Sequence, residues 1–452
     1  MSDSSSRTLV LFFDGTSNDY DVLNTNIVKL HSLLHKDPAK QLCYYQAGIG
    51  TYFQVGEVSS MFTWLARIVD DAIAWYLNTH VLGGYTFLME NYHEGDKICI
   101  FGFSRGAYTA RAVAGMLYKV GLLEKGNLEQ LSFAYKLYKR TDTSGIQLAA
   151  GFKRTFGKIV QIEFMGVWDT ISSVGIVMGR TLPFTNSNYS IKVFRHALSL
   201  DEHRARFQPN LFHRPSPNPS RDPAHASPVL LVDPVKADLV SKNSILQKNL
   251  CQPSDNAKDS EDLSNGESVS DNQRNDTNQN GNGETKTDVL EVWFPGCHTD
   301  IGGNEVPDTT KHSLGRISLR WMICQIINSE CGIIFDEGAL DPYGIDLESS
   351  PVTLVKDDLQ DHESDASQPL HDQLKLNMFW WILEVIPSPY NYQDGEGWWH
   401  DKLSIHLGKS RVIPDHGNGD GPKFHVSVKE RMKSLNYKPR AIWKTGSEVY
   451  VE

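Results

Sequence analysis

Short apolar runs alternate with segments of helical periodicity along the first third of the chain. The runs, rich in Val, Ile and Phe, are typical of buried strands, and the segments with apolar residues three or four positions apart are typical of amphipathic helices. Strands are expected at residues 8–13, 41–45, 97–101 and 159–168, and helices at 26–34, 64–91 (broken near Gly83 and Gly84) and 107–117. Strands that alternate with helices predict an α/β fold, with a mainly parallel sheet covered by helices on both faces.

The composition changes sharply after residue 213. Pro, Ser, Asn and Asp dominate, and between residues 252 and 287 the only apolar residues are Ala257, Leu263 and Val269. Such a segment cannot bury enough apolar surface to offset the entropy lost on ordering. We therefore expect residues 214–288 to form a disordered, low-complexity insertion, with weak apolar spacing for one short helix at 229–250.

The pattern of a folded domain resumes beyond the insertion. A strand is expected at 289–294, followed by a glycine-rich loop at 295–303 and a helix at 318–328. The aromatic-rich and irregular remainder is expected to cap the core. The predicted organisation is a first part of the core at 1–213, the insertion at 214–288, a second part of the core at 289–345 and a cap region at 346–452.

Composition narrows the class of protein. The chain has 452 residues, 40% of them hydrophobic, with 10 Trp, 17 Tyr and 19 Phe, which is ample for a large core. A net charge of −11 without a basic stripe argues against nucleic-acid binding. The six scattered cysteines favour a reducing compartment over a disulfide framework. The polar N-terminus resembles no secretory signal, and no apolar run approaches the ~18 residues of a membrane span, so a soluble, cytoplasmic protein is expected.

The segment 102–106, with the sequence G-F-S-R-G, joins an expected strand to an expected helix. In that context a G-x-S-x-G motif is typical of a nucleophile elbow, a tight turn that exposes the serine hydroxyl at the end of the sheet. Gly102 and Gly106 allow the strand and the helix to approach closely. Ser104 is therefore the candidate nucleophile, and a purely structural Gly/Ser turn is the alternative.

A serine nucleophile needs a base and an acid that orients the base, and in α/β-hydrolase folds these follow in the order Ser, Asp or Glu, His. Asp169 comes directly after the strand at 159–168, and His298 lies in the loop after the strand at 289–294. We therefore expect His298 to be the base and Asp169 the acid. Asp300 competes for the acid role, although its position two residues from His298 favours stabilisation of the loop or the substrate. The alternative for Asp169 is a helix-capping role.

The turn of Asp14, Gly15 and Thr16 follows the first strand, where such folds supply a second oxyanion donor. Backbone N–H groups of Gly15 or Thr16, together with that of Arg105, could stabilise a tetrahedral intermediate. A plain Asx turn is an equal alternative. A metal site made of Asp14, Asp169, His298 and Asp300 is conceivable, but no metal-binding spacing supports it, and no cofactor is expected.

Several blocks of the sequence together resemble one family. They cover residues 12–16, 48–51, 95–111, 166–170, 198–204 and 292–303. The chain resembles an α/β-hydrolase family, long catalogued as a domain of unknown function, that includes the catalytic domain of bacterial type VI secretion phospholipase effectors and many fungal proteins. The resemblance implies a Ser-Asp-His hydrolase of esters, with phospholipids as the substrates of the bacterial members. By motif position it carries the nucleophile over to Ser104, the base to His298 and the acid to Asp169.

Two further segments bear on the site. Residues 201–206 are expected to form a helix whose Asp201, Glu202, Arg204 and Arg206 make a salt-bridge network beside it. Residues 378–386, followed by Trp398 and Trp399, are either an apolar lid over a lipid site or, as the more favoured interpretation, a core-facing helix with buried aromatic residues.

The sequence thus predicts a serine-dependent ester hydrolase that acts through an acyl-enzyme intermediate. Its expected partner is an ester or lipid molecule, with peripheral membrane contact conceivable. Two other classes remain as alternatives: a metal-assisted phosphoesterase, and a non-catalytic interaction protein on a hydrolase scaffold.

Overall fold

The computed structural model describes residues 6–15, 21–48, 62–171, 182, 188, 190–213, 287–346, 351–354, 359–415 and 421–452. Residues 214–286, which hold almost all of the predicted insertion and the helix expected within it, lie outside this part of the chain. Thr16 and residues 49–51 of the family resemblance lie outside it as well.

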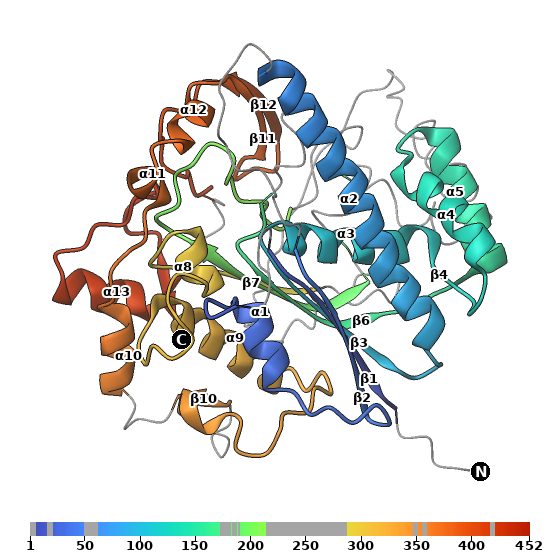
Figure 1. Cartoon of the computed structure of the whole chain (residues 1–452), viewed down its shortest axis with the longest axis horizontal. Coiled ribbons are helices and arrows are strands. Elements are labelled where there is room, and N and C mark those ends of the chain that lie inside the picture. Colours follow the sequence, from blue (N-terminus) through green and yellow to red (C-terminus); the bar gives the residue numbers. More distant parts are fainter. Residues whose placement is uncertain are drawn as a thin grey trace, which may run out of the picture.

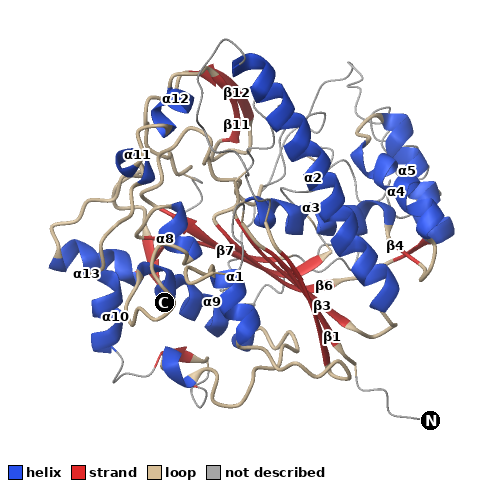
Figure 2. Ribbon diagram, in the orientation of Figure 1, coloured by secondary structure: helices blue, strands red, loops and turns tan. Residues whose placement is uncertain are grey.

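One parallel sheet of eight strands organises the described part of the chain (Figures 1 and 2). Its order is β14-β13-β8-β7-β6-β3-β1-β2, and every pairing between neighbours is parallel. The strands are β1 (Thr8–Phe13), β2 (Gln41–Gln46), β3 (Lys97–Phe103), β6 (Ile162–Trp168), β7 (Ile191–Ser199), β8 (Asp288–Phe294), β13 (Lys423–His425) and β14 (Val449–Val451). The predicted α/β fold class is confirmed.

Side-chain alternation along β1 divides the core into two layers of packing. Leu9, Leu11 and Phe13 belong to one apolar cluster with residues of α2 (Phe62–Asn91), α3 (Arg105–Val120), α4 (Leu128–Lys139) and α5 (Thr143–Phe156). Val10 and Phe12 face α1 (Asn26–Ser32), α9 (Leu314–Asn328) and α10 (Leu359–Ala366) on the opposite side. Because successive side chains of a strand point to opposite faces, an all-apolar strand requires helices on both sides. The result is a three-layer α/β/α arrangement (Figure 2).

The expected break in the second helix is wrong, because α2 continues through both glycines. A Cβ atom on Gly84 would lie 2.5 Å from the Phe13 ring, and one on Gly83 would lie 2.9 Å from the Tyr44 hydroxyl. The glycines are therefore explained by close packing of the helix on β1 and β2.

The region around β7 differs from the sequence analysis in two ways. The sequence does not predict the strand itself, since its apolar residues are interrupted by Lys192, Arg195 and His196. Residues 201–206 form a loop after β7 and not a helix. Within that loop, the expected ion pair between Arg204 and Glu202 is present at 2.7 Å.

The C-terminal third, expected as a cap, also builds part of the sheet. Strands β13 and β14 extend it beyond β8, and Phe424 of β13 packs with Leu198 and Trp293 in a smaller core. Both strands have only three residues, which is too short for a recognisable pattern. This region is therefore integral to the sheet.

The other elements lie around this framework. They are β4 (Leu122–Leu123), β5 (Gly157–Lys158), α8 (His298–Gly302), η2 (Asp341–Tyr343), β9 (Ile345–Asp346), β10 (Thr353–Leu354), α11 (Gln373–Leu376), α12 (Trp380–Glu384), β11 (Ser388–Gln393), β12 (Trp399–Ser404) and α13 (Val426–Ser434).

Candidate active site

Ser104 lies between the last residue of β3 and the first residue of α3, with φ 59° and ψ −122°. Positive φ is costly for a residue with a side chain and persists only where the surroundings impose it. Close packing imposes it here, because a Cβ on Gly106 would lie 2.2 Å from the Phe13 carbonyl oxygen and one on Gly102 would lie 2.6 Å from the Ala107 Cα. The turn therefore has the tight strand-to-helix geometry that the motif predicts.

His298 is the first residue of α8, just after β8, and its buried ring connects two other candidates. Its Nε2 lies 2.8 Å from the Ser104 Oγ, and its Nδ1 lies 2.6 Å from the Asp169 Oδ2. The ring stacks on Phe103 at 4.8 Å and meets the edge of Phe207 at 4.9 Å, measured between ring centroids. The aromatic neighbours keep the imidazole in one plane, aligned with the serine and the aspartate.

Asp169 follows β6 and is fully buried, with φ 38°. The backbone N–H of Ser199 donates to its Oδ1 at 3.0 Å, and the Ser199 hydroxyl donates to its Oδ2 at 3.2 Å. Arg411 donates to both oxygens, at 2.7 and 2.9 Å. The carboxylate is thus held by donors on every side, one of them the His298 ring.

These contacts set the charges of the site. Burial opposes ionisation of Asp169, but the Arg411 charge and the hydrogen bonds from His298 and Arg411 outweigh it and hold the pKa well below its usual range. Burial lowers the pKa of His298 below its ordinary value, and the neighbouring Asp169 opposes that shift only in part. At neutral pH the group is therefore a charged aspartate beside a neutral imidazole, which can accept a proton from Ser104.

The Asp14 side chain in the turn after β1 forms hydrogen bonds within the protein. The buried Asp14 carboxylate accepts the Gly15 N–H at 2.6 Å, the Thr25 hydroxyl at 2.9 Å and the Tyr45 hydroxyl at 2.9 Å. These contacts tie the end of β1 to Thr25, the residue that caps the start of α1. Arg105 opens α3, so its backbone N–H lies outside the intrahelical hydrogen-bond ladder.

The Asp300 carboxylate is hydrogen-bonded to His371 and to the backbone of its own loop. Its Oδ1 lies 2.6 Å from the His371 Nδ1, and its Oδ2 accepts the backbone N–H groups of Cys297 and His371. The carboxylate in contact with His298 is Asp169. The arrangement of Asp300 fits the loop-stabilising alternative.

Glu202 contacts the backbone of His298 and so helps to hold that residue in the candidate site. Its Oε2 accepts the His298 backbone N–H at 3.3 Å and a guanidinium N–H of Arg204 at 2.7 Å. The Arg204 guanidinium also covers the Phe207 ring at 3.6 Å from its centroid. Burial opposes ionisation of Glu202, but the Arg204 charge prevails and lowers the pKa to about 2.

The alternative interpretation as a metal site requires a cluster of ligand side chains. In the part of the chain that the structure describes, no three His, Cys, Asp or Glu side chains are grouped as a metal site would require.

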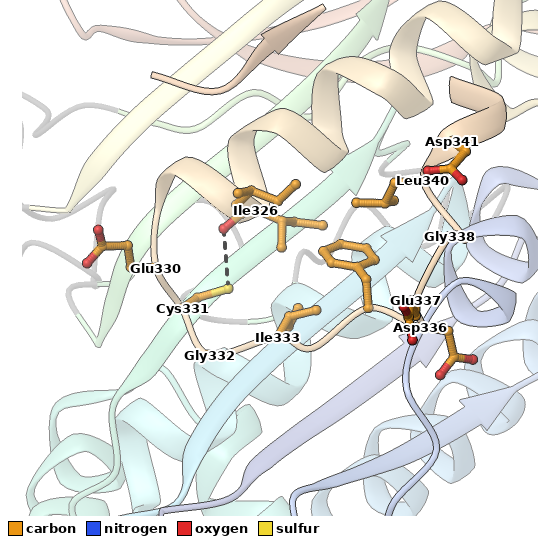
Figure 3. A pocket seen from close by; sticks show the side chains of 12 residues that line it. Ile326, Glu330, Cys331, Gly332, Ile333, Asp336, Glu337, Gly338, Leu340 and Asp341 are labelled. Carbon is orange, nitrogen blue, oxygen red and sulfur yellow. Dashed lines mark hydrogen bonds between the residues drawn. The ribbon is translucent and has the colours of Figure 1, made fainter. Parts of the chain in front are cut away.

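A cavity of about 410 Å³ lies away from Ser104 and is lined by residues that include Ile326, Glu330 and Gly332 (Figure 3). Glu330 and Gly332 accept hydrogen bonds from Lys97 and Thr8 at the starts of β3 and β1, so this cavity lies at the opposite end of the sheet from Ser104.

The favoured interpretation of 378–386 as a buried, core-facing helix is wrong. Met378 is 82% exposed and Phe379 is 61% exposed, and neighbouring apolar side chains are open to solvent as well. We call this set the apolar rim; it comprises Leu376, Met378, Phe379, Trp381, Ile382 and Val385. Trp380, on the inner side of α12, meets the Phe207 ring at 5.4 Å between centroids. Trp380 therefore connects the helix of the apolar rim to Phe207, whose ring contacts the His298 ring.

The family model described as "T6SS, Phospholipase effector Tle1-like, catalytic domain" matches residues 7–325. The chain belongs to this family. The match confirms the family resemblance that the sequence motifs indicate. It ends before Arg411 and before the apolar rim.

Relatives and solved structures were also found. An uncharacterized protein of Saccharomyces cerevisiae is 29% identical over 557 residues, which cover 96% of this chain and 80% of the yeast protein. A crystal structure of an uncharacterized Pseudomonas aeruginosa protein is 16% identical, with a TM-score of 0.37 over 82% of this chain. The Tle1 effector bound to the VgrG spike of the type 6 secretion system is 16% identical, with a TM-score of 0.30 over 68% of this chain. This chain spans about half of each of these two solved chains (52%).

None of the helices in the described ranges combines the length and the apolar character needed to cross a membrane.

Sequence reasoning missed two residues of the site. Ser199 lies in a block noted for the family resemblance but without a role, and Arg411 stands in an irregular segment with no motif around it. Arg411 is separated from Asp169 by 242 positions in the sequence, so no local pattern could have indicated it.

Proposed function

We propose that this protein is a serine hydrolase of lipid esters. Ser104 is the nucleophile, His298 the general base and Asp169 the residue that orients it. The observation that carries the proposal is the continuous chain of contacts from the Ser104 Oγ through both nitrogens of His298 to Asp169, at 2.8 and 2.6 Å. A buried hydrogen-bonded series of this kind is the arrangement that activates a serine hydroxyl.

The reaction proceeds in two steps. The Ser104 Oγ attacks the ester carbonyl carbon while its proton passes to the His298 Nε2, and a tetrahedral oxyanion forms. The ester C–O bond then breaks, the leaving alcohol takes the proton from His298, and the acyl group stays on Ser104. Water, deprotonated by His298, attacks the acyl carbon, and release of the acid restores the serine. Asp169 keeps the Nδ1–H of the imidazole pointing toward itself throughout.

The oxyanion needs preorganised N–H donors at the same position. The Arg105 backbone N–H, at the start of α3 beside Ser104, supplies one of them and benefits from the positive end of the helix dipole. The second donor, expected from Gly15 or Thr16, stays a prediction, since the Gly15 N–H bonds to Asp14 in this structure.

A lipid is the substrate class that the surroundings favour. The family is that of a phospholipase effector catalytic domain. The apolar rim exposes long apolar side chains beside Trp380, which contacts Phe207 near the reacting groups. An exposed apolar patch next to a catalytic group suits contact with a lipid surface, since acyl chains can then reach the site without crossing water.

A fluorophosphonate probe tests the proposal directly. We expect the wild-type protein to be labelled on Ser104 and to hydrolyse a panel of carboxylic esters, whereas Ser104→Ala should lose both properties with little change in Tm. Ser434→Ala, a serine on α13, is the matched control and should behave as wild type. Labelling of Ser104→Ala at another serine would contradict the assignment.

The same assays distinguish Asp169 from Asp300 as the acid. They also distinguish a serine hydrolase from the two alternative classes of protein. Asp169→Asn should lower kcat by about 10³-fold or more, because the imidazole loses its orienting charge, while Asp300→Asn should retain kcat. Turnover that chelators abolish, with no labelling by the probe, would instead indicate a metal-assisted phosphoesterase. A folded protein with neither labelling nor turnover would indicate a non-catalytic scaffold.

A further inference from the structure

Arg411 enters the candidate site from the C-terminal third of the chain, beyond the residues that the family model matches. Its side chain is fully buried, and its two terminal nitrogens donate to the two carboxylate oxygens of Asp169, at 2.7 and 2.9 Å. One of these nitrogens also donates to the Ser199 carbonyl and hydroxyl oxygens, at 2.9 and 2.6 Å. The other also donates to the Phe207 carbonyl oxygen. Arg411 thus forms a bidentate ion pair with Asp169, and each of its terminal nitrogens has a further acceptor in Ser199 or Phe207.

The backbone of Arg411 is fixed by the last part of the fold. The Ile442 N–H donates to the Arg411 carbonyl oxygen at 2.8 Å, and the Ile413 N–H donates to the Ile442 carbonyl oxygen at 2.9 Å. The Ala441 N–H in turn donates to the Leu200 carbonyl oxygen at 2.9 Å, just after β7. Arg411 is therefore tied through two hydrogen-bonded segments to the strand that carries Ser199.

A two-pronged arginine fixes a carboxylate more completely than a point charge does. The planar guanidinium holds the carboxylate plane as well as its position, which the ammonium of a lysine cannot do. In Asp169 that plane decides where Oδ2 lies, and Oδ2 is the oxygen that contacts the His298 ring. The orientation of the imidazole toward Ser104 thus depends on a residue that touches neither of them.

We propose that Arg411 is a positioning residue of the active site, which acts through Asp169 to hold His298 in line with Ser104. The inference rests on the proposed serine-hydrolase function. It makes the C-terminal third part of the catalytic unit, because the residue that orients the acid comes from there.

The positive charge of Arg411 has a consequence for the pH profile. The other ionisable groups around the pair are His196 on β7, Glu202 and Arg204 after β7, His298 on α8 and Tyr390 on β11. Removing the charge leaves the Asp169 carboxylate compensated mainly by His298, which favours the imidazolium form and raises the His298 pKa. The acid limb of kcat/KM should then move to higher pH. A lysine at 411 keeps the charge, so this limb should move less.

The experiment compares Arg411→Lys and Arg411→Met with wild type, measuring kcat, KM, the pH profile and Tm on a soluble ester. Arg431→Met is the matched control, because Arg431 is also a buried C-terminal arginine but donates to the carbonyl oxygens of Ala366 and Gln368. We expect kcat of Arg411→Lys to fall about 10- to 100-fold with KM nearly unchanged, as for a misplaced catalytic group. Arg411→Met should fall further and shift the acid limb upward. Arg431→Met should lower Tm alone.

Several outcomes would overturn the inference. One is an Arg411→Lys protein with wild-type kcat and pH profile, whatever its Tm. Another is failure of both Arg411 variants to fold while Arg431→Met folds, which would make Arg411 a requirement of the fold and not of the chemistry. Ser104→Ala and Asp169→Asn, measured alongside, identify the source of a failure: if they remain active, the proposed function itself is wrong.

Discussion

At the scale of single residues, the proposed chemistry rests on side chains held in costly conformations and surroundings. Ser104 and Asp169 both have positive φ, which only a few of the described non-glycine residues share. Asp169 and His298 are also buried almost completely, where an isolated charge would be unfavourable. Such strain and burial are typical of functional sites, because the surrounding fold must impose them.

The buried imidazole of His298 leads to a prediction about pH. Its pKa lies below the ordinary histidine value, because burial penalises the charged form more than Asp169 favours it. In the proposed mechanism His298 acts as the base only when it is neutral, so kcat/KM on a soluble ester should stay constant down to about pH 6.5, the ordinary histidine value. It should fall only at lower pH, as His298 becomes protonated. The measurement is a profile of kcat/KM between pH 4 and pH 9, restricted to the range in which the protein stays folded.

His371 is the control for this profile. Its hydrogen bond with Asp300 raises its pKa above the ordinary value, so a group titrating above 6.5 could be this residue. His371→Gln should leave the acid limb of the profile in place. An acid limb above pH 6.5 that persists in His371→Gln would contradict the neutral, buried state of His298.

At the scale of elements, the turn at Ser104 depends on how closely α3 approaches β1. The first turn of α3 passes so near the end of β1 that the position of Gly106 has no room for a side chain. The obstruction consists of backbone atoms of Phe13 and Asp14, which cannot rotate away as a side chain could. Glycine is required there by the contact between two elements and not by its own backbone angles.

Gly106→Ala should therefore destabilise the protein and displace Ser104. We expect a loss of about 1–3 kcal/mol, in the range of overpacked core substitutions, together with reduced probe labelling in the folded fraction. Gly151→Ala is the matched control, because Gly151 lies in α5 and a Cβ there would meet nothing within 4 Å. That change should stabilise the protein by about 0.5–1 kcal/mol through helix propensity. Denaturant titrations of both variants check the pair, and equal stabilities would refute the packing argument.

The apolar rim gives a second prediction at this scale. Replacing Met378 and Phe379 by Ser removes two of its most exposed apolar side chains and should leave the core intact. We expect turnover of long-chain lipid esters in vesicles to fall about tenfold or more, since each large apolar side chain contributes about 1.5–3 kcal/mol when buried. Turnover of a soluble short-chain ester should be unchanged.

The control for the rim is Ile159, which is 77% exposed but lies before the start of β6, at the opposite end of the sheet from Asp169. Ile159→Ser should affect neither substrate. Equal loss of activity on vesicles and on the soluble ester in the rim variant would show a general structural effect and remove the case for a lipid-contacting surface.

At the scale of the whole molecule, the proposed active site is assembled from distant parts of the chain. Ser104 and Asp169 come from the first part of the core, His298 follows the predicted insertion, and Arg411 comes from the C-terminal third. The two ends of the insertion meet the same sheet: the Phe212 N–H donates to the Glu291 side chain of β8 at 2.9 Å. Because the chain leaves the sheet and returns to it at neighbouring points, a short connection can join the two ends.

Residues 214–286 should therefore be dispensable for folding and for turnover of a small ester. Replacing them with a short Gly/Ser linker should keep Tm within about 5 °C of wild type, because closure entropy changes by only about 0.6 kcal/mol for each doubling of loop length. Scanning calorimetry and a soluble-ester assay check this. As a control, truncation after residue 404 removes Arg411, β13 and β14 and should abolish the folded state. Misfolding of the linker variant would show that the insertion contributes to the core.

The sequence alone determined the features that depend on neighbouring residues. The apolar runs of β1, β3 and β6, the strand-to-helix motif around Ser104 and the positions of Asp169 and His298 at strand ends all leave local patterns, because side-chain periodicity and turn geometry are set within a few residues. The alternating elements were also enough to predict the parallel sheet with helices on both faces.

Only the tertiary structure decided which distant groups meet. It pairs Asp169 with His298 and Asp300 with His371, although both aspartates suited the acid role by sequence. It brings Arg411 to Asp169 across 242 positions, and it leaves Met378 and Phe379 exposed where their apolar character favoured burial. The physical reason is the same in each case: the partner of a charge and the burial of an apolar side chain depend on what packs against them, and that is set by contacts far apart in the sequence.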